Sequence, residues 1–180
     1  MTPREAGSPA GAAGSAEAAG SAEAAGSAES RLTELGITLP EVPAPAGAYV
    51  PAVISGAHVF TAGQLPFVSG ALPAEGKVGD GPGLVPPADA KAYARLAAIN
   101  ALAAARSVLG SLDRVTRVVK VVGFVASDSS FTGQPGVING ASELLGDVFG
   151  GAGAHARSAV GVAVLPLDSP VEVELTLEFA

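Results

Sequence analysis

The chain has 180 residues, enough for one ordinary domain with an appendage. It has no cysteine, which excludes a disulfide framework, a thiolate metal site and a cysteine nucleophile, and its two histidines are too few for a His-rich metal site. A formal net charge of −7 argues against nucleic-acid binding, because phosphate-binding proteins need a basic surface.

The mean hydropathy is high, at +0.43, but the apolar stretches are short. Arg95 and Arg106 interrupt the Ala-rich stretch, and no run of about 18 apolar residues occurs. The first five residues lead into Ala, Gly, Ser and Glu instead of a Leu-rich segment, so we expect no secretory signal. We therefore expect a cytoplasmic protein that makes no membrane contact.

Residues 1–30 contain no Val, Ile, Leu, Phe or Tyr, and the sequence Gly-Ser-Ala-Glu recurs in them at residues 14–17, 20–23 and 26–29. A glycine every six residues costs a helix about 1 kcal/mol each time. This composition predicts a disordered tail, which is either passive or a linker or docking arm. Residues 31–180 form the predicted single domain, and they carry nine basic and thirteen acidic residues, a net charge of −4.

The first elements of this domain are short. Ser30 is a candidate N-cap for one or two helical turns from Arg31, ended by Gly36, and three prolines (Pro40, Pro43 and Pro45) then predict an extended path. Residues 49–55 and 59–64 predict a β-hairpin. Residues 66–87, with five glycines and five prolines, predict a long loop of the kind that often forms the wall or lid of a site.

The second half alternates helices and strands. We predict a helix over 87–109 with Leu96, Ile99, Leu102, Ala103 and Leu109 on its apolar face, and a second helix over 137–149. Residues 113–126 and 157–165 predict buried strands, the first of them central and covered on both faces. Residues 171–179 alternate strictly and predict a strand with one wet face.

The resulting order, β-β-α-β-α-β-β, predicts an α+β fold in which two helices pack on one face of a mixed sheet. The central strands are too apolar for the other face to remain in water. An uncovered apolar face of this kind predicts a homo-oligomer.

Several segments also occur in the order and spacing of a known family. The most specific are Gly63-Gln64-Leu65-Pro66 and the block formed by Ala156-Arg157-Ser158-Ala159-Val160, Leu165-Pro166 and Val171-Glu172-Val173-Glu174. With Tyr49-Val50, Val118–Val125 and Val137-Ile138-Asn139, they make residues 45–180 resemble the reactive intermediate deaminase family, also called Rid or YjgF-like and formerly endoribonuclease L-PSP.

This resemblance implies a chorismate-mutase-like fold and a homotrimer whose sheets form a central barrel, with three clefts between subunits. It also implies hydrolysis of 2-imino or enamine acids, such as 2-aminoacrylate, to a 2-keto acid and ammonia, without a cofactor or a metal. The loop at 66–87 and the N-terminal extension suggest a longer subfamily.

Arg157 and Glu172 match the family's catalytic positions. The planar fork of an arginine can bind the substrate carboxylate through two parallel hydrogen bonds, although a structural salt bridge or an exposed strand end is the alternative for Arg157. A carboxylate can activate water and protonate the leaving nitrogen. The alternative for Glu172 is a solvated strand face shared with Glu174 and Glu178.

The resemblance adds Tyr49, Gly63 and Asn139 as ligand-binding residues. Their alternatives are packing for Tyr49, a special backbone angle for Gly63 and a helix-start hydrogen bond for Asn139. His155, two residues before Arg157, could line the mouth of the cleft.

Two departures from the family pattern bear on function. Ala62 stands where the family archetype has a ligand-binding serine, and Ala159 stands where it has a cysteine. The change at Ala62 puts the archetypal substrate in question, so a non-catalytic trimeric binding module or sensor for small carboxylates is the alternative function. The acidic charge counts against the ribonuclease activity named in the family's older label.

Overall fold

The computed structural model describes residues 26–42 and 47–180. The disordered tail predicted for residues 1–30 lies outside these ranges up to residue 25, as does the extended path predicted at Pro43 and Pro45. For residues 28–30 the prediction is wrong, because they are helical. The described elements are α1 (Ala28–Glu34), β1 (Ala52–Ser55), β2 (His58–Thr61), α2 (Pro87–Leu109), β3 (Val115–Ala126), α3 (Gln134–Phe149), β4 (Ala156–Val162) and β5 (Val171–Phe179), with short 3-10 helices η1 (Leu112–Arg114), η2 (Gly150–Gly153) and η3 (Pro166–Asp168).

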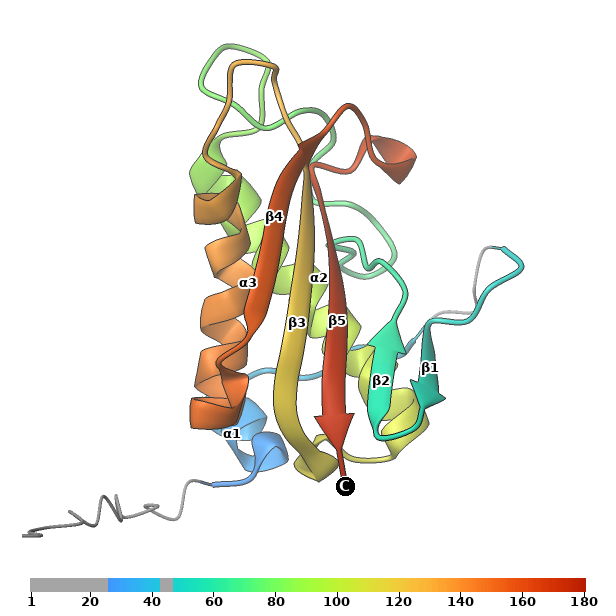
Figure 1. Ribbon diagram of the computed structural model, residues 1–180. Helices are drawn as coiled ribbons and strands as arrows, with labels where there is room; N and C mark the ends of the chain where they lie inside the picture. The colour runs from blue at the N-terminus through green and yellow to red at the C-terminus, as the bar shows by residue number, and fades with distance from the viewer. Residues whose placement is uncertain (1–25, 43–46) are drawn as a thin grey trace, which may run out of the picture.

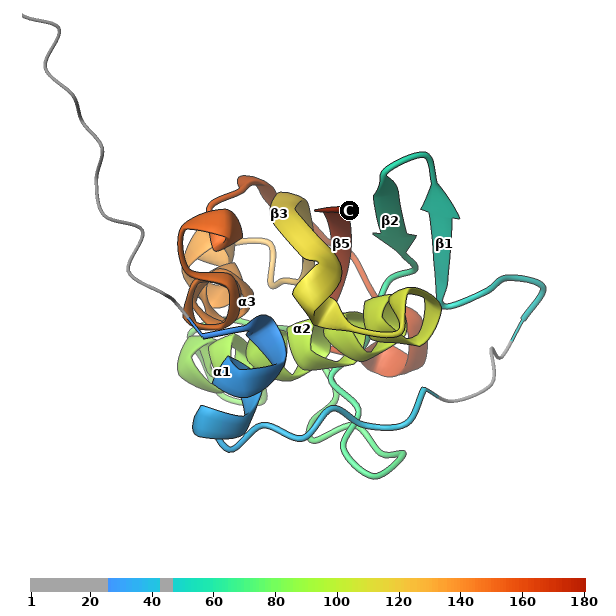
Figure 2. The same ribbon diagram turned by 90° about the horizontal axis from the view of Figure 1, so that it is seen from below.

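The strands form one five-stranded sheet in the order β1-β2-β5-β3-β4. The β3–β4 pair is parallel and the other pairs are antiparallel, so the predicted mixed sheet is confirmed. Helices α2 and α3 lie side by side on one face of this sheet, as Figures 1 and 2 show. The predicted α+β fold with two helices on one face is therefore confirmed.

The hairpin and both long helices are where the sequence places them. Helix α2 has the predicted bounds and ends at Gly110, and α3 begins three residues early, with Pro135 in its first turn. Residues 66–86 form the predicted loop, which contains only isolated bridges such as Val78 to Val85. Among the described residues, no helix is both long enough and apolar enough to cross a membrane.

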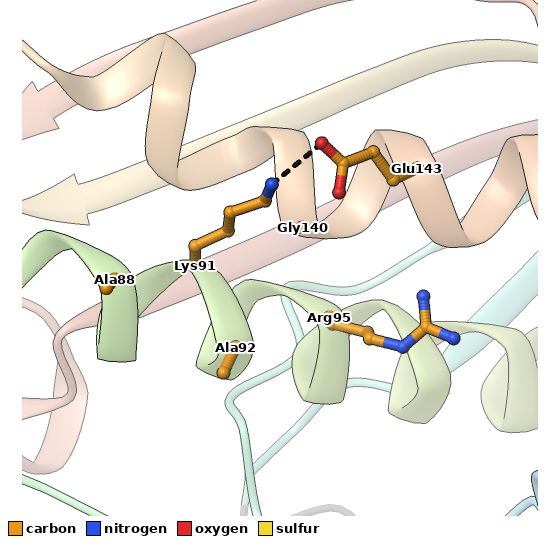
Figure 3. A pocket seen from close by; sticks show the side chains of 6 residues that line it. All are labelled: Ala88, Lys91, Ala92, Arg95, Gly140 and Glu143. Carbon is orange, nitrogen blue, oxygen red and sulfur yellow. Dashed lines mark hydrogen bonds and ion pairs between the residues drawn. The ribbon is translucent and has the colours of Figure 1, made fainter.

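The buried face of α2 differs from the predicted one. Leu96 and Ile99 are only half-buried, whereas a run of alanines is fully buried: Ala90, Ala94, Ala97, Ala98, Ala101, Ala104 and Ala105. Small residues are needed here because α3 approaches α2 closely near Lys91 and Gly140 (Figure 3). A Cβ on Gly140 would collide with the carbonyl oxygen of Lys91. Ion pairs from Lys91 to Glu143 (2.8 Å) and from Arg95 to Asp147 (3.3 Å) join the outer sides of the two helices.

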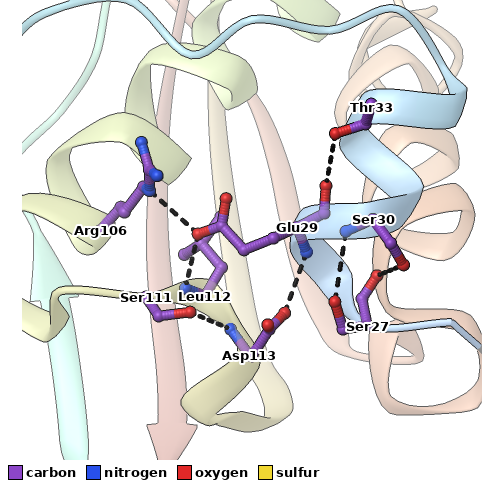
Figure 4. A network of polar contacts seen from close by, with 8 residues as sticks. All are labelled: Ser27, Glu29, Ser30, Thr33, Arg106, Ser111, Leu112 and Asp113. Carbon is purple, nitrogen blue, oxygen red and sulfur yellow. Dashed lines mark hydrogen bonds and ion pairs between the residues drawn. The ribbon is translucent and has the colours of Figure 1, made fainter.

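Helix α1 corrects the predicted N-cap. The helix begins at Ala28, and the hydroxyl oxygen of Ser27, not that of Ser30, accepts the capping N–H at 3.2 Å (Figure 4). The Glu29 carboxylate accepts hydrogen bonds from Arg106 Nε at 2.9 Å and from the Leu112 N–H at 3.1 Å. Residues 26–30 therefore pack on the folded part of the chain through partners about 80 positions away, which no local pattern reveals.

The other face of the sheet, here called the open face, carries no helix from residues 26–42 or 47–180. Val53, Phe60 and Val160 lie on it with 47%, 42% and 44% of their surface exposed. Val122 and Phe124 of β3 are half-buried there, so the prediction that this strand is covered on both faces is wrong for a single chain. The reason is that both long helices lie on the opposite face.

Candidate functional site

Strand β4 directs Arg157 toward the helices. Arg157 lies opposite Val121 of β3, which is fully buried beneath the helices. Its Nη1 donates to Asn139 Oδ1 at 2.8 Å and to Ser142 Oγ at 3.0 Å, and both acceptors lie on α3. The structure thus brings together two predicted site residues, Arg157 and Asn139, with Ser142 beside them.

The guanidinium of Arg157 has no carboxylate partner among residues 26–42 and 47–180, where the ion pairs join other residues. In the same part of the chain, Nε and Nη2 donate no hydrogen bond. The predicted alternative of a structural salt bridge is therefore not found there. A half-buried cation without a counter-charge favours an anionic ligand.

Glu172 lies on the open face, at the start of β5 and opposite Phe124. Its carboxylate covers Gly63, because a Cβ on that glycine would collide with it. The N–H and C=O groups of Gln64 pair with those of Val173 at 2.9 and 3.0 Å, which holds Gly63 beside β5. The absence of a side chain at position 63 is therefore what makes room for this carboxylate.

Glu172 differs from the other acids of β5. Burial, and second the negative charge of Glu174, raise the pKa of the Glu172 carboxyl above its ordinary value of 4.5. A carboxyl in this state accepts a proton more readily than an exposed one. This is not the behaviour of a fully solvated strand face, which was the predicted alternative.

Tyr49 is separate from both groups. It is 55% exposed and lies just before β1, at the opposite edge of the sheet from β4. Four strand spacings of about 4.8 Å separate these edges, roughly 19 Å. Within one chain, Tyr49 therefore does not approach Arg157.

The site residues form two half-sites. The Arg157 half-site (Asn139, Ser142 and Arg157) faces the helices, and the Glu172 half-site (Gly63 and Glu172) lies on the open face. Two surface grooves, of about 240 Å³ between α2 and α3 and about 460 Å³ along residues 39–42 and α2, contain none of these residues. The part of the chain that the structure describes holds no cluster of three or more His, Cys, Asp or Glu side chains suited to a metal.

Ser142 is the site residue that sequence reasoning missed. It follows Asn139 by three positions, so the two side chains share one face of α3. Its Oγ also lies 3.0 Å from His155 Nε2, and His155 Nδ1 lies 2.6 Å from the carbonyl oxygen of Gly153. The i, i+3 spacing was visible in the sequence, but nothing in the sequence connected it with His155.

Fold and half-sites together define an α+β protein with an arginine and a carboxylate on opposite faces of a mixed sheet. The family described as YjgF/chorismate_mutase-like, a description that also names an endoribonuclease, matches residues 29–179. The chain belongs to this family, as its sequence motifs indicate.

The chain is also similar to individual proteins. Protein TCP17 of Trypanosoma cruzi is 44% identical over an alignment of 156 positions that covers 83% of this chain and 92% of that protein. The crystal structure of Atu1372 from Agrobacterium tumefaciens, a protein described as of unknown function, is 44% identical with a TM-score of 0.76, covering 84% of this chain and 91% of that one. Escherichia coli TdcF, solved with bound serine, is 27% identical with a TM-score of 0.57, covering 78% and 94%.

Proposed function

We propose that this protein hydrolyses reactive 2-imino and enamine acids to 2-keto acids and ammonia in the cytoplasm. The observation that carries the proposal is the guanidinium of Arg157, which has unused N–H groups and no carboxylate partner among the described residues. The bound serine in the TdcF structure supports a small ligand that carries a carboxylate.

The reaction assigns a separate task to each half-site. Arg157 binds the substrate carboxylate and fixes the position of the neighbouring imine carbon. Glu172 accepts a proton from water as the water oxygen bonds to that carbon, and it then supplies the proton to the nitrogen. The product of this addition is a carbinolamine, whose hydroxyl then gives its proton through Glu172 to the nitrogen as the C=O bond forms and the C–N bond breaks. Ammonia and the 2-keto acid are released, with water as the only co-reactant. An enamine first becomes the imine by moving a proton from its nitrogen to its terminal carbon.

The two half-sites point to a cleft between subunits. They lie on opposite faces of the sheet, so one chain does not place them on the same substrate. A second copy covering the open face would bring its Arg157 edge toward Gly63 and Glu172 of the first, and it would also cover Val53, Phe60 and Val160. We propose a homotrimer with three such clefts, in which Tyr49 closes the ligand pocket.

A second candidate function is a non-catalytic module that binds small 2-keto carboxylates. The observation that favours it is Ala62, which lacks the hydroxyl of the serine found there in the family archetype. Both functions use Arg157, and they differ in whether the bound imine is hydrolysed.

One assay separates the two functions. 2-Aminoacrylate or 2-iminopropionate is generated in solution, and 2-keto acid release is followed with wild type, Arg157→Ala and the control Arg117→Ala, which removes an exposed arginine from the start of β3. The proposal expects acceleration by wild type and the control and its loss in Arg157→Ala. Release at the uncatalysed rate for every imino acid tried would exclude the deaminase. A rise in Tm with pyruvate, absent in Arg157→Ala, would then favour the binding module.

A further inference from the structure

A continuous chain of hydrogen bonds runs from Arg157 into the protein. Arg157 Nη1 donates to Ser142 Oγ at 3.0 Å, Ser142 Oγ lies 3.0 Å from His155 Nε2, and His155 Nδ1 lies 2.6 Å from the carbonyl oxygen of Gly153. The three side chains come from two elements and the loop between them, α3, β4 and the residues after η2. All three are half-buried, and Gly153 is buried.

The positions of the protons in this series of hydrogen bonds follow from the groups at its two ends, the Arg157 guanidinium and the Gly153 carbonyl oxygen. A carbonyl oxygen only accepts, so His155 Nδ1 must carry the proton that it donates to Gly153. In the neutral ring Nε2 then has a lone pair and accepts the hydroxyl proton of Ser142. The Ser142 oxygen keeps a lone pair for Arg157, so every bond donates in the same direction, from Arg157 to Gly153.

This arrangement decides which edge of the guanidinium remains available. Nη1 has two N–H groups, and both are used, one by Asn139 at 2.8 Å and one by Ser142. The remaining edge, formed by Nε and Nη2, presents two parallel N–H groups. That edge matches the two oxygens of a carboxylate.

We propose that Ser142 and His155 are positioning residues that hold Arg157 with its Nε–Nη2 edge toward the substrate carboxylate. Their effect on turnover rests on the proposed function, whereas their effect on carboxylate binding does not. Neither residue belongs to the motifs that identify the family in this sequence. Among residues 26–42 and 47–180 no carboxylate pairs with Arg157, so in this part of the chain its charge is balanced by no acidic side chain.

The first test is the tautomer of His155, which requires no activity. The chain has only two histidines, so nitrogen NMR of histidine-labelled full-length protein gives two ring systems, and the spectrum of His58→Gln assigns them. The proposal expects neutral His155 with its proton on Nδ1. A proton on Nε2 would overturn it, because the chain of donors would then be broken at Ser142.

The second test compares side chains at position 142. Ser142→Ala removes the hydroxyl and should weaken pyruvate binding, measured by calorimetry, about tenfold, the loss expected for one such hydrogen bond. Ser142→Thr keeps the hydroxyl and should bind as wild type does. Ser107→Ala removes an exposed helical serine from α2 and is the matched control.

Ser142 and His155 should also act as one unit in holding Arg157. His155→Phe should weaken binding as much as Ser142→Ala does, and the double variant should lose little more than either. In turnover the same variants should raise KM with little change in kcat. Additive losses, or unchanged pyruvate affinity in both single variants, would overturn the proposal. Loss of pyruvate affinity in these variants without imine hydrolysis by wild type would instead retain the positioning role and exclude the deaminase.

Discussion

The two faces of the sheet are built differently. On the helix face, alanines and Gly140 allow close packing, and Arg157 is held by partners from its own chain. On the open face, Phe60 and Val160 remain more than 40% exposed, and Glu172 is partly buried beside Glu174. One chain therefore completes the structure of the helix face, whereas the apolar side chains of the open face stay exposed in a single chain.

The largest expected effect is on the helix face. Gly140→Ala places a Cβ against the backbone carbonyl of Lys91, which cannot rotate away, so α2 and α3 must separate. We expect a loss of about 3 kcal/mol in the free energy of unfolding, measured by urea denaturation at fixed protein concentration. Gly146→Ala, on the same helix with no atom within 4 Å of the added Cβ, should instead stabilise by about 0.5–1 kcal/mol. Equal effects of the two substitutions would contradict the close-packing argument.

The next effect tests whether the open face is an interface. Val160→Asp introduces a charge beside Phe124, which lies opposite Glu172, and full burial of a valine or phenylalanine side chain contributes about 1.5–3 kcal/mol. We expect sedimentation at micromolar concentration to show a trimer for wild type and monomers for Val160→Asp. The matched control is Val108→Asp, which changes a 37% exposed valine on α2. A wild-type monomer of about 17.4 kDa would exclude the shared cleft.

Gly63 tests the Glu172 half-site without removing its carboxylate. Gly63→Ala would displace the Glu172 side chain, since the added Cβ occupies its position. We expect kcat/KM for imine hydrolysis to fall about 100-fold, as for a catalytic group misplaced by about 1 Å. Pyruvate binding at Arg157 should change less. Gly136→Ala, where the added Cβ meets nothing within 4 Å, is the control, and a similar loss there would remove the role assigned to Gly63.

These predictions depend on features that differ in how visible they are in the sequence. Local patterns were sufficient for β5, which alternates strictly, and for α2, which lies between Pro87 and Gly110. They were not sufficient for the start of α1, because Glu29 is fixed by Arg106 and Leu112, far along the chain. Contacts of this kind arise only after the chain has folded.

The candidate site divides in the same way. Its residue types were available from motifs, and Arg157 and Asn139 do meet. The separation of Arg157 and Glu172 onto opposite faces was not visible, because it depends on the register of β3 with both β4 and β5. A motif lists the residues of a site, but the register decides which of them one chain can bring together.

The smallest expected effect is the pH dependence caused by Glu172. Its pKa is raised in the folded protein, mainly by burial, so ionisation is easier after unfolding. Below the ordinary pKa of 4.5 the Glu172 carboxyl is protonated in both the folded and the unfolded protein, and burying this neutral group costs the least free energy. As the pH rises through the raised pKa, the carboxyl ionises where burial disfavours the charge, and the free energy of unfolding decreases. Glu172→Gln should therefore be slightly more stable than wild type at neutral pH.

The stability difference between Glu172→Gln and wild type should disappear as the pH falls below 4.5. Paired thermal unfolding curves across this range measure it, with Glu178→Gln, on the same face of β5, as the control for loss of one negative charge. A difference that stays constant with pH would mean that the substitution changes packing and not ionisation. The expected result is a stability difference that Glu172→Gln shows, that Glu178→Gln does not show, and that is absent in acid. It would mean that the folded protein holds the ionised Glu172 carboxylate at a cost in stability, as a proton-accepting site requires.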